Sequence, residues 1–325
     1  AGAGASAGAG GASFLQVRPA DFGTSSSGVT SKDWSAHAPY TKKPLDQGAC
    51  GSCWAFAAGG ALQMYAELST QRAAGGASLL ETSGNSSANM AEMAASLSMG
   101  QIVECTQNPQ ECGGKGRCEG ATAELAFEFV AKHGLTSAKH HGYLQGATCN
   151  LDTPKFLETG GLVRLPENML GPLLDLIRDV GPAAVSVDAA KWNSYQNGIF
   201  DDCPRDAIVN HAVLLVGFGV DTSAAGAPVK YWLVRNSWGP GWGEGGFIRV
   251  FRHDGDINDP DKGYCGMDNK PRDGVGCKGG PSEIPVCGMC GILSDSSAPV
   301  DVELVGAGTR AAGAMKEPHL LPVAA

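Results

Sequence analysis

The stretch Gln47-Gly48-Ala49-Cys50-Gly51-Ser52-Cys53-Trp54-Ala55-Phe56 carries the most chemical information in this chain of 325 residues. A short glycine-rich turn delivers Cys53 to the start of a segment, Trp54 to Glu67, whose apolar residues recur at helical spacing. Unpaired backbone N–H groups and the helix dipole favour an anion at a helix N-terminus. Cys53 is therefore expected to favour its thiolate form, which is the nucleophilic form. Upstream, the Gln47 side-chain amide is placed to donate to a developing oxyanion. The structural alternative is a disulfide beside a buried helix, and we expect Cys50 to be bridged in either case.

The cysteine content indicates an oxidising compartment. Eleven cysteines are too many for an ordinary cytosolic protein of this length, and the odd number leaves one thiol without a partner. Buried thiols or metal ligands are the alternative for several of them. The sequon Asn85-Ser86-Ser87 adds weak support for a secretory route. No signal peptide is recognisable and the first residue is Ala1, so we expect a processed end or a start inside a precursor.

Bulk composition excludes two classes of function. The chain is 43% apolar and 18% charged, as in soluble globular proteins, and has no apolar stretch long enough to span a membrane. Its net charge is −9 and it has no dense basic patch, so nucleic acid is not an expected partner.

Periodicity predicts helices first and strands later. Beyond Trp54 to Glu67, helical spacing recurs in two further segments, Leu125 to Val130, stopped by Gly134, and Leu170 to Ile177, halted by Gly181-Pro182. Four short segments have strand composition: Ala183–Val187, Ala212–Phe218, Val229–Arg235 and Gly246–Phe251. Exposed loops are expected at Ala73–Asn89 and at the acidic run His253 to Asp261. This segregation predicts an α+β fold with a helical half and a β-rich half.

Two later segments contain further candidate residues. Asn210-His211-Ala212-Val213-Leu214-Leu215-Val216-Gly217-Phe218-Gly219 places His211 at the head of an apolar strand. A lone histidine beside a strand is usually structural or merely exposed. Asn236-Ser237-Trp238-Gly239-Pro240-Gly241-Trp242-Gly243-Glu244 is rich in glycine, but it lacks the strand, loop and helix context of a phosphate-binding loop.

Together these segments resemble the papain-like cysteine protease family. Gln47 to Phe56 resembles the active-site segment of papain and the lysosomal cathepsins over ten continuous residues. The second and third segments resemble that family's catalytic-histidine and asparagine segments, and the likeness extends from about Asp33 to Asp268. It implies a papain-like two-domain α+β fold, in which a mainly helical domain carries Cys53. A β-barrel-like domain would then carry His211 and Asn236 across a cleft.

The resemblance also implies the role of each catalytic residue. Cys53 would attack as a thiolate paired with protonated His211, which then protonates the leaving amine, while Asn236 orients the imidazole ring. Gln47 and the backbone N–H of Cys53 would form the oxyanion hole. Trp238 would shield the Asn236–His211 contact from water and line the leaving-group side of the substrate-binding cleft. An ordinary buried aromatic is the alternative interpretation, and the two are compatible. The implied reaction is endopeptidase cleavage through a thioester, with no cofactor and no metal.

The substrate-binding strand departs from the family pattern, because Gly120-Ala121 stands where two glycines are usual. Alanine can still pair with an extended substrate if its φ is negative. The resemblance assigns small residues to the main specificity pocket: Thr122, Ala123, Ser186, Val209 and Ala212.

The resemblance assigns three disulfides: Cys50–Cys118, Cys105–Cys149 and Cys203–Cys265. Cys53 is then left free, as a nucleophile must be. Four cysteines remain without an assigned pairing: Cys112, Cys277, Cys287 and Cys290. A zinc site is one possibility, but the absence of a nearby histidine favours additional disulfides.

We expect a flexible leader over 1–29, a peptidase domain over 30–294 divided near 150 and 151, and a loosely ordered tail over 295–325. The expected partners are polypeptide substrates and cystatin-type protein inhibitors. A monomer in the lysosome, the vacuole or the extracellular space is expected.

A catalytically silent homologue is one alternative, but such proteins typically lose the cysteine or the histidine. An exopeptidase would need a loop blocking one end of the cleft, and the only adjacent histidine pair, His140-His141, follows the second helix instead of preceding it. Internal cleavage is therefore favoured.

Overall fold

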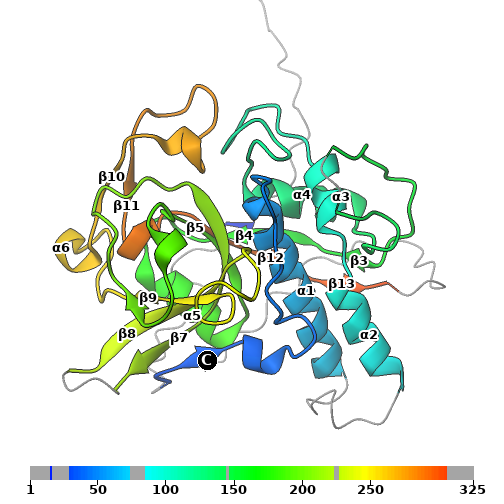
Figure 1. The fold of residues 1–325 in the computed structure, drawn as a ribbon, viewed down its shortest axis with the longest axis horizontal. Helices are drawn as coiled ribbons and strands as arrows, with labels where there is room; N and C mark the ends of the chain where they lie inside the picture. Colours follow the sequence, from blue (N-terminus) through cyan, green and yellow to red (C-terminus); the bar gives the residue numbers. More distant parts are fainter. Residues whose placement is uncertain (1–14, 17–28, 74–84, 144–145, 223–226, 306–325) are drawn as a thin grey trace, which may run out of the picture.

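The computed structural model describes residues 15–16, 29–73, 85–143, 146–222 and 227–305, and it has an α+β fold (Figure 1). Three helices (85–95, 99–105 and 123–133) lie on one side of α1 (Cys53–Ala73), and most strands lie on the other. The predicted segregation of helices and strands is confirmed. None of the helices in the described ranges is long and apolar enough to cross a bilayer.

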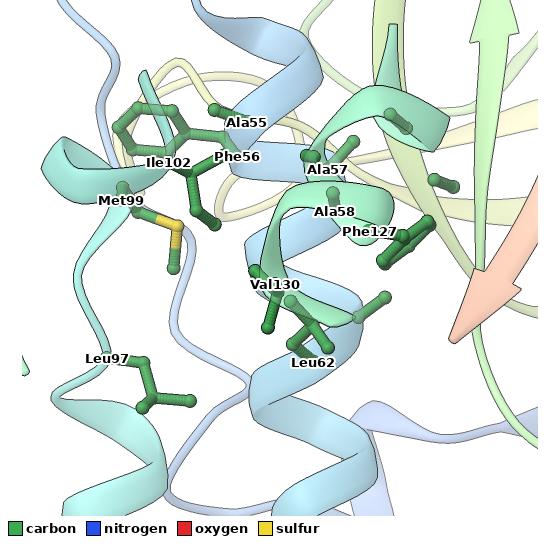
Figure 2. Close-up of a cluster of buried hydrophobic side chains, with 14 of the residues drawn as sticks. Ala55, Phe56, Ala57, Ala58, Leu62, Leu97, Met99, Ile102, Phe127 and Val130 are labelled. Carbon is green, nitrogen blue, oxygen red and sulfur yellow. The ribbon is translucent and has the colours of Figure 1, made fainter. Parts of the chain in front are cut away.

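The helical half is built around α1, whose side chains are buried on nearly every face. Three helices accompany it: α2 (Asn85–Ala95), α3 (Met99–Cys105) and α4 (Ala123–His133). Figure 2 shows Met99 and Ile102 from α3 on one side of α1 and Phe127 and Val130 from α4 on another. Alanines on α1 allow these neighbours to approach closely.

The β-rich half is one nine-stranded sheet, in the order β1-β4-β12-β5-β7-β8-β9-β6, with β2 also paired to β7. Its strands are β1 (Leu15–Gln16), β2 (Lys32–Asp33), β4 (Gly161–Arg164), β5 (Ala183–Val187), β6 (Ile199–Phe200), β7 (His211–Asp221), β8 (Val229–Arg235), β9 (Phe247–Phe251) and β12 (Ser296–Val300). The order has two ends, so these strands do not close into the predicted barrel. Helix α5 (Leu170–Asp179) packs on this half through Leu173, Leu176 and Ile177.

The smaller elements lie outside the main sheet. They are β3 (Leu157–Glu158) paired with β13 (Glu303–Leu304), β10 (Gly266–Asp268) paired with β11 (Ile284–Val286), and the short helix α6 (Pro260–Gly263). The predicted helices and strands all occur, and β5 and β8 have the predicted bounds. The stop at Gly134 is also confirmed, because this glycine has a φ of +69° directly after α4.

Three predictions of irregular structure are wrong in part. The expected tail from residue 295 contains β12, which lies inside the sheet between β4 and β5, and β13. The expected loop Ala73–Asn89 ends in the first residues of α2, and 74–84 lie outside the described residues. Within the expected leader 1–29, Leu15–Gln16 form β1 in parallel pairing with β4. The remainder of that leader up to residue 28, and the tail beyond residue 305, lie outside the described residues.

Five disulfides connect ten of the eleven cysteines. The structure has the expected bridges Cys50–Cys118 and Cys105–Cys149. The expected Cys203–Cys265 bridge is wrong, because Cys203 pairs with Cys290 and Cys265 pairs with Cys287. The fifth bridge joins Cys112 to Cys277. Asp188 directly follows β5, and its backbone N–H donates to the Cys290 carbonyl at 2.9 Å. This contact helps to hold Cys290 near Cys203.

Candidate active site

Cys53 is the first residue of α1 and the only free cysteine in the chain's described part, where its side chain is partly exposed. The turn before it is held against the segment that carries Cys118, because Gly51 N–H donates to the Cys118 carbonyl at 3.0 Å. A Cβ on Gly51 would lie 2.5 Å from that same oxygen. Glycine is therefore required here for the turn to approach the Cys118 segment closely.

His211 is the first residue of β7, and its side chain faces Cys53 across the junction of the two halves. Its Nε2 lies 2.8 Å from Asn236 Oδ1, which also accepts a hydrogen bond from the backbone N–H of Ser237 at 2.8 Å. Because a carbonyl oxygen only accepts, Nε2 must carry the proton. The other ring nitrogen, Nδ1, is thereby left for the thiol of Cys53.

The electrostatic environment favours an ion pair between these two side chains. Burial raises the pKa of the Cys53 thiol, but the His211 charge, a hydrogen bond to its ring, and the backbone N–H groups of Ala212 and Trp54 outweigh that effect, so the pKa is lowered. Burial lowers the pKa of His211, and here the Cys53 charge and hydrogen bonds to Cys53 and Asn236 outweigh it, so that pKa is raised. The arrangement therefore favours thiolate and imidazolium together.

Gln47 is buried, and its side chain is anchored at both ends of the amide. Its Nε2 donates to the Cys50 carbonyl at 2.8 Å, and its Oε1 accepts from Ser237 Oγ at 2.5 Å. The amide has a second N–H that these contacts leave free to donate. This geometry is compatible with the predicted donation to an oxyanion.

Two supporting residues were not found from the sequence. Tyr143 OH donates to the Gln47 carbonyl at 2.8 Å, and it accepts from Ser52 Oγ at 2.7 Å. Ser52 belongs to the quoted segment and is fully buried, so its hydroxyl needed a partner. Tyr143 lies far along the chain and carries no local signal.

Aromatic side chains surround the histidine. Trp238 lies with its ring centroid 5.1 Å from that of His211, and Trp192 contacts the same ring edge-on at 6.3 Å. Trp242 packs on both tryptophans, at 5.1 and 6.1 Å. Trp192 and Trp242 were not predicted to support the site, although Trp242 belongs to the asparagine segment. This cluster can exclude water from the contact between His211 and Asn236.

A cavity of about 270 Å³ adjoins the nucleophile. It is lined by Gly51, Cys53, Gly113, Cys118, Glu119, Gly120, Ala121, Ser186, Asn210, His211, Ala212, Asp273 and Gly274. Of the residues expected to bind substrate, Gly120, Ala121, Ser186 and Ala212 are brought together here. Thr122 and Ala123 are buried at the start of α4, Val209 packs with Ala207 and Val286, and Trp238 lies against the histidine.

No metal centre is found among the residues that the structure describes, because no group of three or more His, Cys, Asp or Glu side chains is arranged to hold an ion. The cysteines considered for zinc, including Cys277, Cys287 and Cys290, form disulfides.

Comparison with known proteins agrees with this geometry. A family model described as papain family cysteine protease matches residues 29–83 and 73–274, which together make up most of the chain. The chain belongs to the papain family of cysteine proteases. Its expected family and its papain-like α+β fold are thereby confirmed.

Individual papain-family proteins are moderately similar. A KDEL-tailed cysteine endopeptidase from Arabidopsis thaliana is 32% identical over 248 residues, covering 73% of this chain and 57% of that protein. Vignain from Phaseolus vulgaris is 31% identical, covering 68% and 53%. The chain thus spans about half the length of the curated relatives it matches.

Solved papain-family structures share the fold. Bromelain protease from Ananas comosus, in complex with the E64 inhibitor, has a TM-score of 0.58 at 27% identity, covering 84% of this chain and 99% of that one. Digestive procathepsin L 3 from Tenebrio molitor has a TM-score of 0.59 at 27% identity, covering 90% and 75%.

Proposed function

We propose that this chain is a cysteine peptidase in which Cys53 is the nucleophile and His211 is the acid and base. The observation that carries the proposal is the hydrogen-bonded series Cys53–His211–Asn236, with the thiol at a helix N-terminus and the imidazole at the head of a buried strand. The retained cysteine and histidine argue against a silent homologue that only binds peptides.

The proposed reaction proceeds in two steps. The Cys53 thiolate adds to the scissile carbonyl, and the resulting oxyanion receives hydrogen bonds from the Gln47 side chain and the Cys53 backbone N–H. Collapse breaks the C–N bond, the imidazolium of His211 gives its proton to the leaving amine, and a thioester remains. His211 then accepts a proton from water, whose oxygen attacks the thioester and releases the acid. Asn236 holds the ring in place, and Trp238 shields the contact.

Polypeptides are the proposed substrates, and the solved bromelain structure with E64 supports binding of that inhibitor here. We extend the proposal to protein inhibitors of cystatin type and to a monomeric enzyme. A secretory route is supported by the five disulfides and by the KDEL-tailed relative, since KDEL is a signal for retention in the endoplasmic reticulum. The lysosome, the vacuole and the extracellular space remain the proposed destinations.

Internal cleavage, predicted from the sequence, remains untested. An exopeptidase is the second candidate, because one observation favours it: loops from the two halves meet at one end of the cavity, between Gly113 and Gly274.

The test of catalysis is labelling of the purified, reduced protein with E-64, alongside Cys53→Ala. We expect mass spectrometry to locate one adduct on Cys53, and a panel of fluorogenic peptides to report turnover that the variant lacks. Thermal melting of both proteins serves as the control for folding. A folded protein with neither an adduct nor turnover would establish a silent binding homologue instead.

A further inference from the structure

Two loops, one from each half of the molecule, are joined over the cavity. We call residues 106–117 and 269–278 together the strap; in Figure 1 its parts lie at the top of the view, in teal and orange. The disulfide Cys112–Cys277 links them covalently. Gly113 N–H donates to the Gly276 carbonyl at 3.0 Å, and Lys278 N–H donates to the Gln110 carbonyl at 2.8 Å.

Charged side chains add to this junction. Glu111 receives Arg272 Nη2 at 3.2 Å and Lys278 Nζ at 3.4 Å, so one carboxylate on the helical side binds two cations on the β side. These ion pairs are exposed and individually weak. The disulfide and the two backbone hydrogen bonds therefore hold the strap closed, and the ion pairs reinforce them.

The strap is in direct contact with the substrate-binding residues. A Cβ on Gly113 would lie 2.3 Å from the Gly274 carbonyl and 3.0 Å from that of Ala121. A Cβ on Gly274 would lie 2.1 Å from the Val209 carbonyl. The backbone thus makes a continuous wall from Ala121, through Gly113 and Gly274, to Val209. The cavity lies between this wall and the Cys53–His211 pair.

The side of the cleft that the wall closes follows from the proposed function, on which this inference rests. His211 gives its proton to the leaving amine, so the leaving group lies toward His211 and Trp238. The acyl portion must then extend the other way, along Gly120 and Ala121 toward Ser186. The wall therefore limits the number of substrate residues on the N-terminal side of the scissile bond.

The wall is also acidic. Asp273 and Glu119 line the cavity, and no lysine or arginine lines it. Glu119 has a distant partner, Lys115, at 3.7 Å, and the neighbouring Arg272 is bound to Glu111. Among the described residues, Asp273 has no ion-pair partner, so its carboxylate is available to a cation from the substrate. A free α-ammonium group carries such a charge, whereas an internal peptide nitrogen does not.

We propose that the strap makes this chain an exopeptidase that removes one or two residues from a free N-terminus, with Asp273 receiving the substrate's α-ammonium group. Ala121 is expected to pair with the second residue on the acyl side. Because Gly113 already contacts the Ala121 carbonyl, little room is left for a third. The reaction remains simple hydrolysis, with water supplying the atoms of the new carboxylate and amine.

The test compares matched fluorogenic dipeptides that differ only in acetylation of the N-terminus. We expect kcat/KM for the free amine to exceed that for the acetylated form about tenfold or more. Asp273→Asn should reduce this ratio to about threefold or less. The matched control, Asp261→Asn, removes an exposed carboxylate far from the cavity and should leave the ratio as it is. Dipeptides with Arg or Leu as the second residue test whether a basic side chain is recognised instead of the free α-ammonium group. If the acetylated Arg dipeptide is cleaved as fast as the same dipeptide with a free amine, the proposal is overturned.

Opening the strap supplies an independent test. The probe is an acetylated peptide with four residues before the scissile bond. We expect the intact chain to cut this peptide slowly and the double variant Cys112→Ser/Cys277→Ser to cut it faster. E-64 labelling and thermal melting of the variant monitor its folding. If the intact chain is labelled at Cys53 yet cuts this acetylated peptide as fast as free dipeptides, the strap proposal fails alone. If it is neither labelled nor active, the proposed function fails.

Discussion

Nε2 of His211 donates a hydrogen bond to Asn236, and this single contact decides which ring nitrogen faces the thiol. At the scale of single residues, the site depends on hydrogen bonds that fix the orientation of each polar side chain. Gln47 illustrates the same point, since Cys50 and Ser237 hold its amide on two sides. Preorganised donors of this kind need no reorientation during reaction.

The pH dependence of Cys53 alkylation should report the ion pair. The Cys53 pKa is lowered, so iodoacetamide should react at pH values well below an ordinary thiol pKa of about 8.5. His211→Ala removes the opposite charge and the hydrogen bond and leaves burial, which raises the pKa. We therefore expect the midpoint of the rate profile to move to higher pH in the variant. An unchanged midpoint would show that His211 does not stabilise the thiolate.

Asp295 should make stability depend on pH. Burial, together with the charge of Glu124, raises its pKa to about 7, while Ser186 Oγ donates to it at 2.6 Å. An unfolded aspartate titrates near 3.9, so the folded protein holds this proton more tightly. Its contribution to stability is fully present below pH 4 and is lost as the pH rises through about 7. Asp295→Asn should therefore raise the free energy of unfolding at pH 8 by ~2 kcal/mol relative to wild type, and by much less at pH 4.

Urea unfolding at both pH values measures this effect. Asp152→Asn, at an exposed position, is the matched control. Its change in the free energy of unfolding relative to wild type should be small at both pH values. An Asp295→Asn variant that is equally destabilised at both pH values would show that the carboxylate is ionised and favourable in the native state.

The sequence predicted candidate catalytic residues where they lie in contiguous, recognisable segments. Cys53, His211, Asn236 and Gln47 each lie in such a segment, and the structure brings all four together. Tyr143 lies in no such segment, because it reaches Gln47 across 96 positions of the chain. Long-range packing of this kind leaves no local pattern.

At the scale of elements, α1 depends on glycines that make room for its neighbours. A Cβ on Gly60 would lie 2.0 Å from the Arg235 guanidinium, and one on Gly59 would lie 2.1 Å from the sulfur of Met99. Arg235 is buried, its pKa is lowered to about 10 by that burial, and it donates to the Thr41 carbonyl. It therefore has little freedom to move aside.

Gly60→Ala should destabilise the protein by about 1–3 kcal/mol through overpacking. The matched control is Gly142→Ala, where the nearest atom to a new Cβ is an oxygen 3.8 Å away, so we expect a change within about 0.5 kcal/mol. Thermal and urea unfolding provide both values. A Gly60→Ala variant as stable as wild type would show that Arg235 can relocate without loss.

Element bounds were predictable where the pattern was strong, as for β5 and β8. Strand β12 was missed because its sequence, Ser-Ser-Ala-Pro-Val, contains a proline, which argues against a central strand. The structure resolves this conflict, since β5 pairs only with Ser296 and Ser297, and Pro299 lies beyond that pairing. The wrong partner for Cys203 has a different cause, because the bridge to Cys265 was assigned from the family resemblance, whereas Cys203 pairs with Cys290.

At the scale of the whole molecule, the disulfides have two different roles. Cys50–Cys118 and Cys105–Cys149 lie within the helical half, and Cys203–Cys290 and Cys265–Cys287 lie within the β-rich half. Cys112–Cys277 alone connects the halves, across 165 positions of the chain. This closure was not predictable, because neither loop has a distinctive pattern and their meeting depends on the complete fold.

The position of β12 has a consequence for folding during synthesis on the ribosome. β4 and β5 are made early, but the strand that lies between them is among the last described residues to emerge. A nascent chain that has already exposed Cys53, His211 and Asn236 thus still lacks the middle of its sheet. Since pairing between distant segments is slow, the sheet can be completed only after β12 has been synthesised. The fold that brings Cys53, His211 and Asn236 together is therefore complete only after β12 has joined β4 to β5.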